Sequence, residues 1–254
     1  MVTLLNIGNT HTQIARVSGG QVTLVRRVAT MELVAGSLPE ELRVLSGPCL
    51  AACVVPAAAA ALRQALPTGA VVFLDARLVT EVSLARVDAS TLGADRIANA
   101  VAAVSEYGGP VVVLDCGTCI TTEAVDAQNC FCGGAILPGR ALLRRVLHEH
   151  TGQLPLVELG QACPAALGTC TRDAILAGVD VGILGAVERL LADSRSGLGA
   201  PSCPVVTVGG DAEFFCRHLP GLVPGQALFT LYGLAVVAAR LFVRASPPSG
   251  PQAG

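Results

Sequence analysis

Val2-Thr-Leu-Leu-Asn-Ile-Gly-Asn-Thr-His11 opens the chain, and Val111-Val-Val-Leu-Asp-Cys-Gly-Thr-Cys-Ile-Thr121 repeats its plan near the middle. In both stretches an apolar run ends on a polar residue, and a glycine turn with a threonine leads into a second patterned stretch. A buried strand that turns on glycine can present backbone N–H groups and a hydroxyl to a phosphate. Two such turns predict two half-sites for one nucleotide, and hence phosphoryl transfer from ATP.

The composition indicates that much of the chain is buried. Hydrophobic residues make up 52% of the 254 residues and charged residues 14%, and the net charge is −2. Because so few charges cover the surface of a monomer poorly, we expect an oligomer with an apolar interface. No basic stripe indicates a nucleic-acid partner, and no polybasic helix indicates an anionic membrane.

The N-terminus enters strand-like sequence at once, without a positive n-region or a cleavage signal. The most apolar long run, residues 228–243, is interrupted by Gly233 and Arg240. We therefore expect a cytoplasmic protein with a buried C-terminal helix. Ten cysteines include Cys116-x-x-Cys119 and Cys130-x-Cys132. We interpret them as reduced thiols that fill the core, and a zinc cluster is the less favoured alternative because a C-x-C arm is atypical of structural zinc.

Strands and helices alternate along the chain. Apolar, β-branched runs predict strands at residues 3–7, 21–28, 49–55, 70–74, 111–114, 120–125 and 204–208. Helical spacing of apolar residues predicts helices over residues 57–66, 94–107, 140–150 and 172–192. Glycines 178, 182 and 185 lie within the last helix and predict close approach of a neighbouring backbone. This order predicts an α/β fold with domains at residues 1–108 and 109–245 and a disordered tail at 246–254.

Each of the two glycine turns also has a purely structural interpretation. Gly8 would let a phosphate approach the backbone of the first turn, whose side-chain donors are Asn9, Thr10 and Thr12. The alternative is an ordinary β-hairpin, because Gly-Asn is a common turn dipeptide. In the second turn Asp115 ends a buried run, where a carboxylate needs a cation or several hydrogen bonds to stay ionised. We expect a metal or potassium ion there, and a structural turn is the alternative.

Two further motifs place charged residues at predicted helix starts. In Gly93-Ala-Asp-Arg96, Asp95 can accept a proton from a hydroxyl and Arg96 can hold a substrate carboxylate. Taken alone, a first-turn helix acid beside a surface arginine explains this motif better. Val208-Gly-Gly-Asp211 would let the backbone lie against adenosine or phosphate. Alternatively, Asp211 caps a tight strand-to-helix connection.

Together and in this order, these motifs resemble the type III pantothenate kinases, a family of the superfamily that contains acetate and sugar kinases, Hsp70 and actin. The resemblance runs from the first residues to about Leu241 and includes the last helix. The motifs that carry it are Asn6-Ile-Gly-Asn-Thr10, Gly93-Ala-Asp-Arg96, Asp115-x-Gly-Thr-x-x-Thr121, Gly133-Gly-Ala-Ile-Leu-Pro-Gly139, Thr171-x-x-Ala-Ile175 and Val208-Gly-Gly-Asp211. The implied fold has two duplicated ribonuclease H-like domains of the actin-like ATPase fold, with a cleft between them.

The resemblance implies ATP-dependent phosphorylation of pantothenate to 4′-phosphopantothenate, the first step of coenzyme A biosynthesis, by a homodimer. It implies that Asp95 is the general base and that Asp115 binds a monovalent cation, K⁺ or NH₄⁺, while Mg²⁺ accompanies ATP. The implied pantothenate-binding residues are Gly93, Ala94, Asp95, Arg96 and Thr171. The implied ATP-binding residues are Asn6, Ile7, Gly8, Asn9, Thr10, His11, Thr12, Gln13 and Thr118.

Two departures from the family pattern leave alternatives open. Asn6 stands where the family has an acid that organises magnesium and the phosphates. Asparagine keeps an oxygen but loses the charge, so we expect lower metal affinity and turnover. Asn6 therefore allows a second hypothesis, a catalytically weakened or inactive nucleotide-binding relative that acts as a regulatory factor. Arg86 stands in place of a tyrosine of the substrate pocket, which allows a third, a kinase or ATPase of the same superfamily with another substrate.

Overall fold

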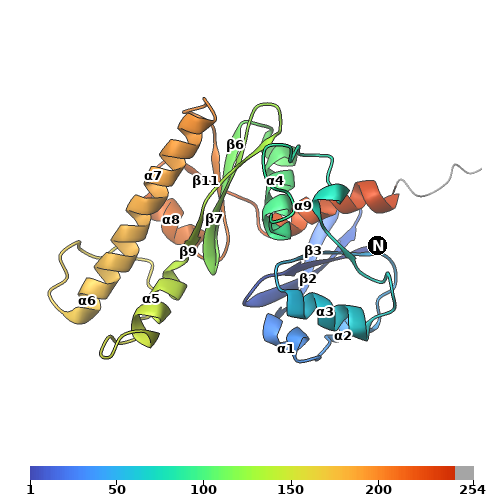
Figure 1. The fold of residues 1–254 in the computed structure, drawn as a ribbon, viewed down its shortest axis with the longest axis horizontal. Coiled ribbons are helices and arrows are strands. Elements are labelled where there is room, and N and C mark those ends of the chain that lie inside the picture. The colour runs from blue at the N-terminus through green and yellow to red at the C-terminus, as the bar shows by residue number, and fades with distance from the viewer. Residues whose placement is uncertain (244–254) are drawn as a thin grey trace, which may run out of the picture. The chain divides into compact units, whose positions relative to one another are not determined.

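The computed structural model describes residues 1–243, and these form two compact units that interleave along the chain (Figure 1). Unit 1 comprises Met1–Glu81, Ser90–Ser105 and the described residues from Thr230 onward. Unit 2 comprises Val82–Ala89 and Glu106–Phe229. The domain boundary expected at residue 108 stays a prediction, and the tail expected at 246–254 lies outside the described residues.

The sheet of unit 1 combines an antiparallel meander with two parallel strands. Its strands are β1 (Val2–Ile7), β2 (His11–Ser18), β3 (Gln21–Ala29), β4 (Cys49–Cys53) and β5 (Val72–Phe73), in the order β3-β2-β1-β4-β5. β2 pairs antiparallel with β1 and β3, whereas β4 pairs parallel with β1 and β5. The central strand β1 is apolar on both faces because Leu4, Leu5 and Ile7 are all buried.

The sheet of unit 2 repeats this topology. Its strands are β6 (Val111–Cys116), β7 (Cys119–Val125), β8 (Phe131–Gly133), β10 (Val205–Val208) and β11 (Leu222–Pro224), in the order β11-β10-β6-β7-β8. β7 pairs antiparallel with β6, β8 and the short β9 (Ile136–Pro138), and β10 pairs parallel with β6 and β11. When the short β9 is set aside, the strands of each unit lie in the same order: the third, second, first, fourth and fifth along the chain. This duplication confirms the predicted α/β fold of two ribonuclease H-like domains.

Helices accompany each sheet. Those that lie mainly in unit 1 are α1 (Thr30–Val34), α2 (Glu40–Arg43), α3 (Pro56–Ala65), the 3₁₀ turn η1 (Ala76–Leu78), α4 (Ala94–Tyr107), α9 (Phe229–Ala238) and the π-helical turn η3 (Ala239–Val243). Those of unit 2 are α5 (Arg140–Glu149), α6 (Thr171–Leu176), the π-helical turn η2 (Ala177–Val181), α7 (Gly182–Gly197) and α8 (Ala212–His218). The apolar faces of these helices close a hydrophobic core in each unit.

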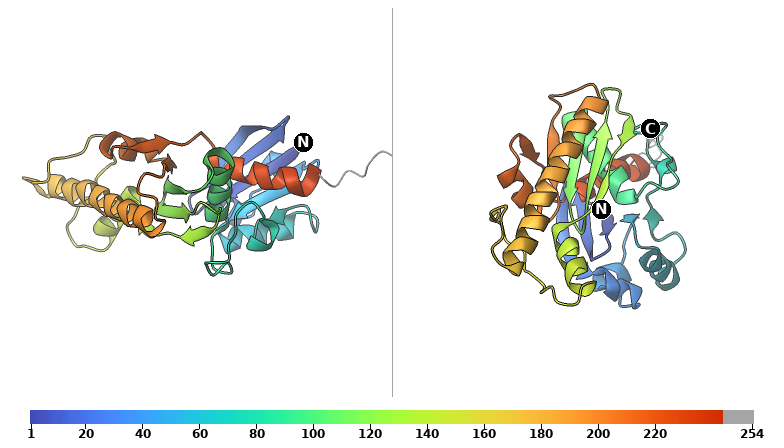
Figure 2. Two further views of the ribbon diagram at one scale, coloured as in Figure 1. Left: turned by 90° about the horizontal axis from the view of Figure 1, so that it is seen from above. Right: turned by 60° about the vertical axis from the view of Figure 1, so that its left-hand side comes forward.

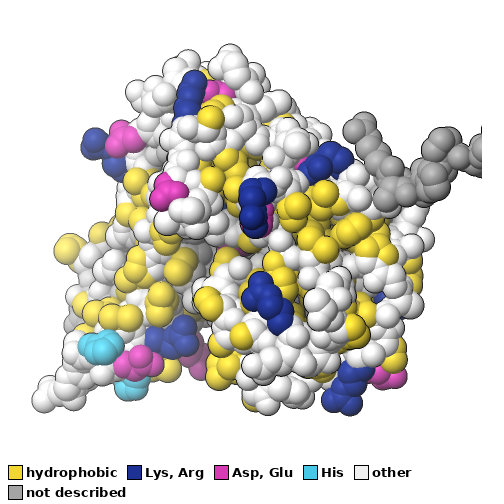
Figure 3. Space-filling view, turned by 45° about the vertical axis from the view of Figure 1, so that its right-hand side comes forward, with side chains coloured by type: hydrophobic (Ala, Val, Ile, Leu, Met, Phe, Trp, Pro, Cys, Tyr) yellow, Lys and Arg dark blue, Asp and Glu magenta, His cyan; other side chains and the backbone are white. Residues whose placement is uncertain are grey.

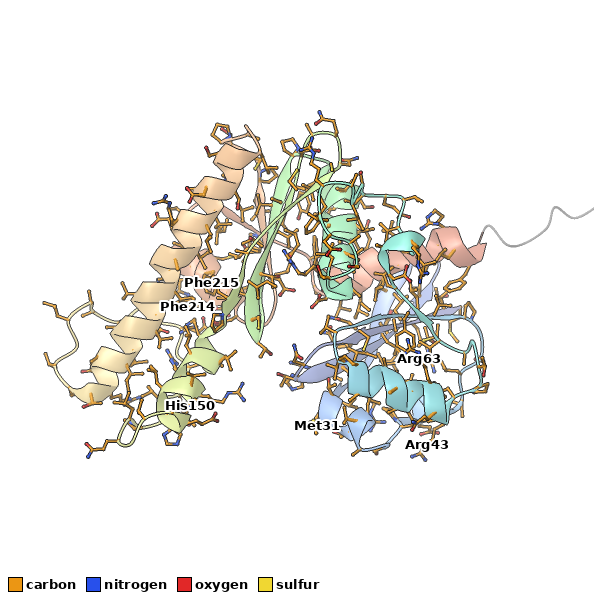
Figure 4. All side chains as sticks on the ribbon, in the orientation of Figure 1. Met31, Arg43, Arg63, His150, Phe214 and Phe215 are labelled. Carbon is orange, nitrogen blue, oxygen red and sulfur yellow. The ribbon has the colours of Figure 1, made fainter. Side chains whose placement is uncertain are left out.

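In unit 2, α7 lies against β6 and β7, as Figure 2 shows. Ile183, Val187 and Leu191 follow one another at helical spacing on its buried face. They join strand residues and two phenylalanines of α8, Phe214 and Phe215, which are labelled in Figure 4. The two phenylalanine rings meet edge to face, with centroids 5.4 Å apart. This core supports the strands that carry the second glycine turn.

In unit 1, α9 packs directly on α4. Gly233 lies so close to the α4 backbone that a Cβ atom there would be 2.7 Å from the Ala98 carbonyl carbon and nearer still to its oxygen. Thr230 Oγ1 donates a hydrogen bond to the buried Asn99 Oδ1 at 2.8 Å. Leu231, Leu234 and Val237 are fully buried, which confirms the buried C-terminal helix. None of the described helices combines the length and the apolar character needed to cross a membrane.

Several elements differ from the sequence expectation. Among the described residues, β2, β8, β9 and β11 were not predicted, because β2 begins with polar residues and the others are too short to show a periodicity. The helix predicted over 172–192 runs from 171 to 197 and contains the π-helical turn η2. Within the described chain no backbone approaches Gly178, Gly182 or Gly185, so that prediction was wrong.

The cysteines are all free thiols. Cys49, Cys116, Cys130 and Cys203 are buried, as a core-filling role requires, whereas Cys163 and Cys170 are exposed. The described residues contain no group of three or more His, Cys, Asp or Glu side chains placed to hold a metal ion.

We expect Gly233→Ala to lower the free energy of unfolding by about 3 kcal/mol, since overpacking against fixed backbone costs about 1–3 kcal/mol and this contact is closer than van der Waals distance. Gly197→Ala in α7 is the matched control because a Cβ atom there meets nothing within 4 Å. Because Gly197 is the last residue of α7, where helix propensity has little effect, the free energy of unfolding of the control should change by less than about 0.5 kcal/mol. Urea denaturation of both variants measures the difference, and equal stabilities would contradict the packing of α9 on α4.

Candidate active site

The first glycine turn joins β1 to β2 in unit 1. Gly8 N–H donates to the His11 carbonyl oxygen at 3.1 Å, and Ile7 pairs with Thr12 where the strands meet. The turn is therefore a β-hairpin, so the hairpin interpretation is correct as local structure. Asn9, Thr10 and His11 are exposed at its tip. The side chains of Ile7 and Thr12 are buried in the core, so only their backbone groups can face a ligand.

A threonine that the sequence analysis did not single out holds this hairpin. Thr30 Oγ1 donates to the Gly8 carbonyl oxygen at 2.6 Å, and its backbone N–H donates to the Thr10 carbonyl oxygen at 3.0 Å. Because a hydroxyl has one proton to donate, Thr12 is the donor in the 3.0 Å contact between the two threonine hydroxyls. No local pattern marked Thr30, since it lies at the start of the five-residue helix α1.

Asn6 faces Gln13 across the same hairpin. Asn6 Nδ2 donates to Gln13 Oε1 at 3.1 Å, and the two residues are register partners of β1 and β2. The amide nitrogen of Asn6 is thus engaged, and its Oδ1 is the atom that can bind a cation. A single neutral oxygen suits Mg²⁺ as one ligand among waters and phosphate oxygens, but it supplies no charge.

The second glycine turn joins β6 to β7 in unit 2 and has the same construction. Gly117 N–H donates to the Cys119 carbonyl oxygen at 3.0 Å, and Cys116 pairs with Ile120. Gly117 is exposed and Thr118 is half-buried. The two turns therefore have equivalent places in their sheets, as the repeated sequence predicts, because each turn joins the first two strands of its sheet.

Two glycines from elsewhere in unit 2 pack on this turn. Gly139 N–H donates to the Thr118 carbonyl oxygen at 2.9 Å, and a Cβ atom at 139 would lie 2.7 Å from that oxygen. Gly209 has a φ of +94°, and a Cβ atom there would lie 2.5 Å from the Cys116 carbonyl oxygen. The backbone after Gly209 continues this contact, since Asp211 N–H donates to the same oxygen at 3.0 Å. Any side chain at 139 or 209 would push the turn away.

Asp115 and Asp211 lie beside this turn. Asp115 is half-buried, and a Cβ atom at Gly209 would lie 2.6 Å from its Oδ1. A carboxylate oxygen at this position is a suitable ligand for K⁺ or NH₄⁺. Asp211 stands at the N-cap of α8, yet its side chain makes no capping bond. Instead Asp211 Oδ1 accepts a hydrogen bond from Arg140 Nη1 at 2.8 Å, so Asp211 is the N-cap residue by position, as the structural alternative expected, while its side chain has another partner.

Asp95 lies in the first turn of α4. Its Oδ1 accepts the Arg96 backbone N–H at 2.8 Å and lies over Gly93, where a Cβ atom would be 2.7 Å from it. Burial raises the pKa of the Asp95 carboxyl, and the Arg96 backbone N–H and charge oppose that rise. A desolvated carboxylate at a helix start can accept a proton from a nearby hydroxyl.

Other predicted residues are arranged as follows. In unit 1, Gly93 and Arg96 are half-buried and Ala94 is buried, whereas Thr171 is exposed at the start of α6 in unit 2. Arg86 pairs with Asp126 at 2.9 Å and donates to Cys132 Sγ at 3.3 Å.

The duplicated order of five strands, to which β9 is added in unit 2, and the glycine turn in each unit define a protein of the actin-like ATPase fold. The chain belongs to the type III pantothenate kinase family, whose model matches residues 3–193.

Type III pantothenate kinases of three bacteria are similar in sequence. The chain is 40% identical to that of Thermomicrobium roseum over 143 residues, 40% to that of Roseiflexus castenholzii over 153, and 43% to that of Gloeobacter violaceus over 150. These matches cover 56%, 60% and 58% of this chain, and 54%, 59% and 64% of the relatives. The chain thus spans between about half and two thirds of the length of the curated relatives that it matches.

Two solved structures share the fold. One is described as a Baf family transcriptional activator from Campylobacter jejuni, with a TM-score of 0.64, 18% identity, and coverage of 94% of this chain and 98% of that one. The other is the ethanolamine utilization protein EutJ from Carboxydothermus hydrogenoformans, with a TM-score of 0.53, 15% identity, and coverage of 92% and 89%. At these identities the likeness shows the fold alone.

We expect Asp95→Asn to raise the free energy of unfolding at neutral pH. The pKa of Asp95 is higher in the folded protein than in the unfolded chain. The free energy of unfolding of the wild type therefore falls as the pH rises from the unfolded-state pKa to the folded-state pKa of Asp95, and above the folded-state pKa this loss is complete. Below the ordinary aspartate pKa of about 3.9 the variant should match the wild type. Urea denaturation across this pH range measures the effect.

Asp75→Asn is the control, because it should lower the free energy of unfolding at neutral pH where Asp95→Asn raises it. The bond from Arg77 lowers the pKa of Asp75, so this carboxylate adds stability above its unfolded pKa that is lost on acidification. If the free energy of unfolding at neutral pH rises in both variants, or in neither, the result would argue against a desolvated Asp95.

Proposed function

We propose that the chain phosphorylates pantothenate with ATP to give 4′-phosphopantothenate, the first step of coenzyme A biosynthesis. The observation that carries this proposal is the family match over residues 3–193, which contains every candidate catalytic, substrate, ATP and cation residue. The curated relatives carry the name of the same kinase. The regulatory alternative has no comparable support, because the activator among the structural neighbours shares only the fold.

In the proposed mechanism Asp95 accepts the proton of the pantothenate hydroxyl as the oxygen attacks the γ-phosphorus of ATP, while the bond from that phosphorus to the β,γ-bridging oxygen breaks and ADP leaves. Burial raises the pKa of Asp95, which makes its carboxylate a stronger base. Arg96 would pair with the pantothenate carboxylate beside residues 93–94, and Thr171 is the further residue to which we assign a contact with pantothenate. Phosphoryl transfer needs little more from the protein than alignment and charge neutralisation.

The hairpin residues 6–13 and Thr118 would hold the ATP phosphates through backbone N–H groups and hydroxyls. Mg²⁺, when bound, neutralises phosphate charge, and the Oδ1 of Asn6 is the protein atom that we assign to it. Asp115 would hold K⁺ or NH₄⁺ beside the second turn. Since Asn6 brings no negative charge, we expect weaker Mg²⁺ binding and slower turnover than an aspartate would give.

We further propose that the protein is a cytoplasmic homodimer. Hydrophobic side chains cover broad areas of the face in Figure 3, with charged side chains scattered among them. Large apolar residues are more than half exposed at several places in both units: Met31, Val44, Ile136, Leu156 and Leu167. Exposed apolar surface of this kind is typical of protein interfaces.

The first test is a kinase assay with pantothenate, ATP, Mg²⁺ and K⁺, in which mass spectrometry detects 4′-phosphopantothenate. We expect product with the wild type, and we expect Asp95→Asn to lower kcat by about 100-fold or more, the usual contribution of a general base. ATP affinity should change by less than about twofold in this variant. In the wild type, kcat/KM should fall as pH drops below the raised pKa of Asp95.

The absence of product at millimolar substrate would overturn the proposed reaction. Product formation with unchanged turnover in Asp95→Asn would remove Asp95 from the role of base and leave the reaction standing.

A second test restores the acid at position 6. We expect Asn6→Asp to raise kcat about tenfold, equivalent to 1.4 kcal/mol of transition-state stabilisation, and to lower the Mg²⁺ concentration needed for half-maximal rate. Gln13→Glu is the matched control, since it adds the same charge across the same 3.1 Å amide contact. We expect no increase in kcat in this control. A protein that stays inactive with aspartate at position 6 would favour the regulatory alternative.

A further inference from the structure

Two arginines one turn apart on α5 are buried in unit 2. Arg140 and Arg144 are each 1% exposed, although most arginines in proteins keep the guanidinium in water. Taking two such charges out of water is costly unless each is paired and hydrogen-bonded.

Arg140 uses each nitrogen of its guanidinium group. Nε donates to Asp180 Oδ1 at 2.9 Å, Nη1 to Asp211 Oδ1 at 2.8 Å, and Nη2 to the Gly160 carbonyl oxygen at 2.7 Å. The guanidinium carbon lies 3.4 Å from the centroid of the Phe214 ring. Arg140 therefore connects α5 to α8 directly and holds a fixed orientation, because the planar fork fits only one arrangement of these partners.

Arg144 shares one of these partners but not the other. Its Nη2 contacts both oxygens of Asp180 at 2.6 Å, and its Nη1 donates to the Glu158 carbonyl oxygen at 2.6 Å. Arg144 therefore bonds to Asp180 and Glu158, and it acts on Asp211 as a nearby charge. The two arginines and two aspartates together carry no net charge. Burial lowers the pKa of Arg144 and raises that of Asp211, as expected for charges taken out of water.

The contact between Arg140 and Asp211 joins two segments that both touch the second glycine turn. On the α5 side, Gly139 N–H donates to the Thr118 carbonyl oxygen at 2.9 Å, directly before Arg140. On the α8 side, the backbone N–H of Asp211 itself donates to the Cys116 carbonyl oxygen at 3.0 Å. The turn is therefore held from both sides by backbone contacts, and the Arg140–Asp211 ion pair fixes the distance between those two sides.

We propose that Arg140 is a positioning residue for nucleotide binding: through Asp211 it clamps the starts of α5 and α8 on the turn formed by residues 116–119. This inference rests on the proposed function, in which that turn contacts the ATP phosphates. Asp180 holds the opposite edge of the guanidinium and balances the charge of Arg144. Arg144 stabilises the same buried cluster without acting on the turn.

The experiment compares Arg140→Lys with Arg144→Lys in the full chain. Both changes keep the charge and remove a guanidinium hydrogen bond to Asp180, but only Arg140→Lys removes the hydrogen bond to Asp211. We expect the dissociation constant for ADP, measured by calorimetry, to rise about 5- to 10-fold in Arg140→Lys and less than about 2-fold in Arg144→Lys. The KM for ATP should rise in the same way, and the KM for pantothenate should not.

Hydrogen exchange gives a direct readout of the clamp. The backbone amides of Gly139 and Asp211 should lose protection in Arg140→Lys and keep it in Arg144→Lys. If Arg140→Lys does not fold, Asp211→Asn tests the same contact from its other end, with the remote amide of Gly139 as the readout.

Three outcomes would count against these ideas. Equal ADP affinities and equal protection in the two lysine variants would overturn the inference and leave the proposed function intact. Protection of Gly139 that persists in Asp211→Asn would also overturn the inference. A wild-type protein that binds no ADP would overturn the proposed function, and the inference with it.

Discussion

The closest backbone approach in the candidate site is the packing of two glycines on one hairpin turn. Gly139 and Gly209 each lie where a Cβ atom would overlap the carbonyl oxygens of residues 116–118. Backbone packed on backbone leaves the turn little freedom, because peptide groups are stiff and no side chain can rotate aside. The start of α5, the start of α8 and the β6–β7 turn are consequently one rigid assembly. The assigned roles of Asp115 and Thr118 depend on that rigidity.

The two units support equivalent turns by different means. In unit 2 glycine contacts and the ion pair of the buried Arg140 with the half-buried Asp211 restrain the turn from both sides. In unit 1 the hydroxyl and backbone N–H of Thr30 bind the Gly8 and Thr10 carbonyl oxygens. A duplicated strand order therefore does not require duplicated side chains. It requires only that the carbonyl groups of each exposed turn have fixed partners.

The sequence predicted the fold and both turns because these depend on local patterns. An apolar run followed by glycine and threonine indicates a buried strand and its turn wherever it occurs. Helix α5 shows where local patterns fail. The spacing of its apolar residues predicts a helix, yet Val146 is 42% exposed while Arg140 and Arg144 are buried. Their partner Asp180 is 36 to 40 residues away along the chain, and no periodicity connects such distant charges.

By itself the sequence determined the α/β class, the two glycine turns, the position of Asp95 at a helix start and the family to which the chain belongs. Each of these follows from residues that are neighbours along the chain. Only the tertiary structure decided that Thr30 holds the first hairpin, that the side chain of the N-cap residue Asp211 binds Arg140, and that two arginines lie inside unit 2. These contacts join segments that are distant in sequence, so they form only when the chain folds. Burial then removes the water that would otherwise screen the charges, and this strengthens the ion pairs.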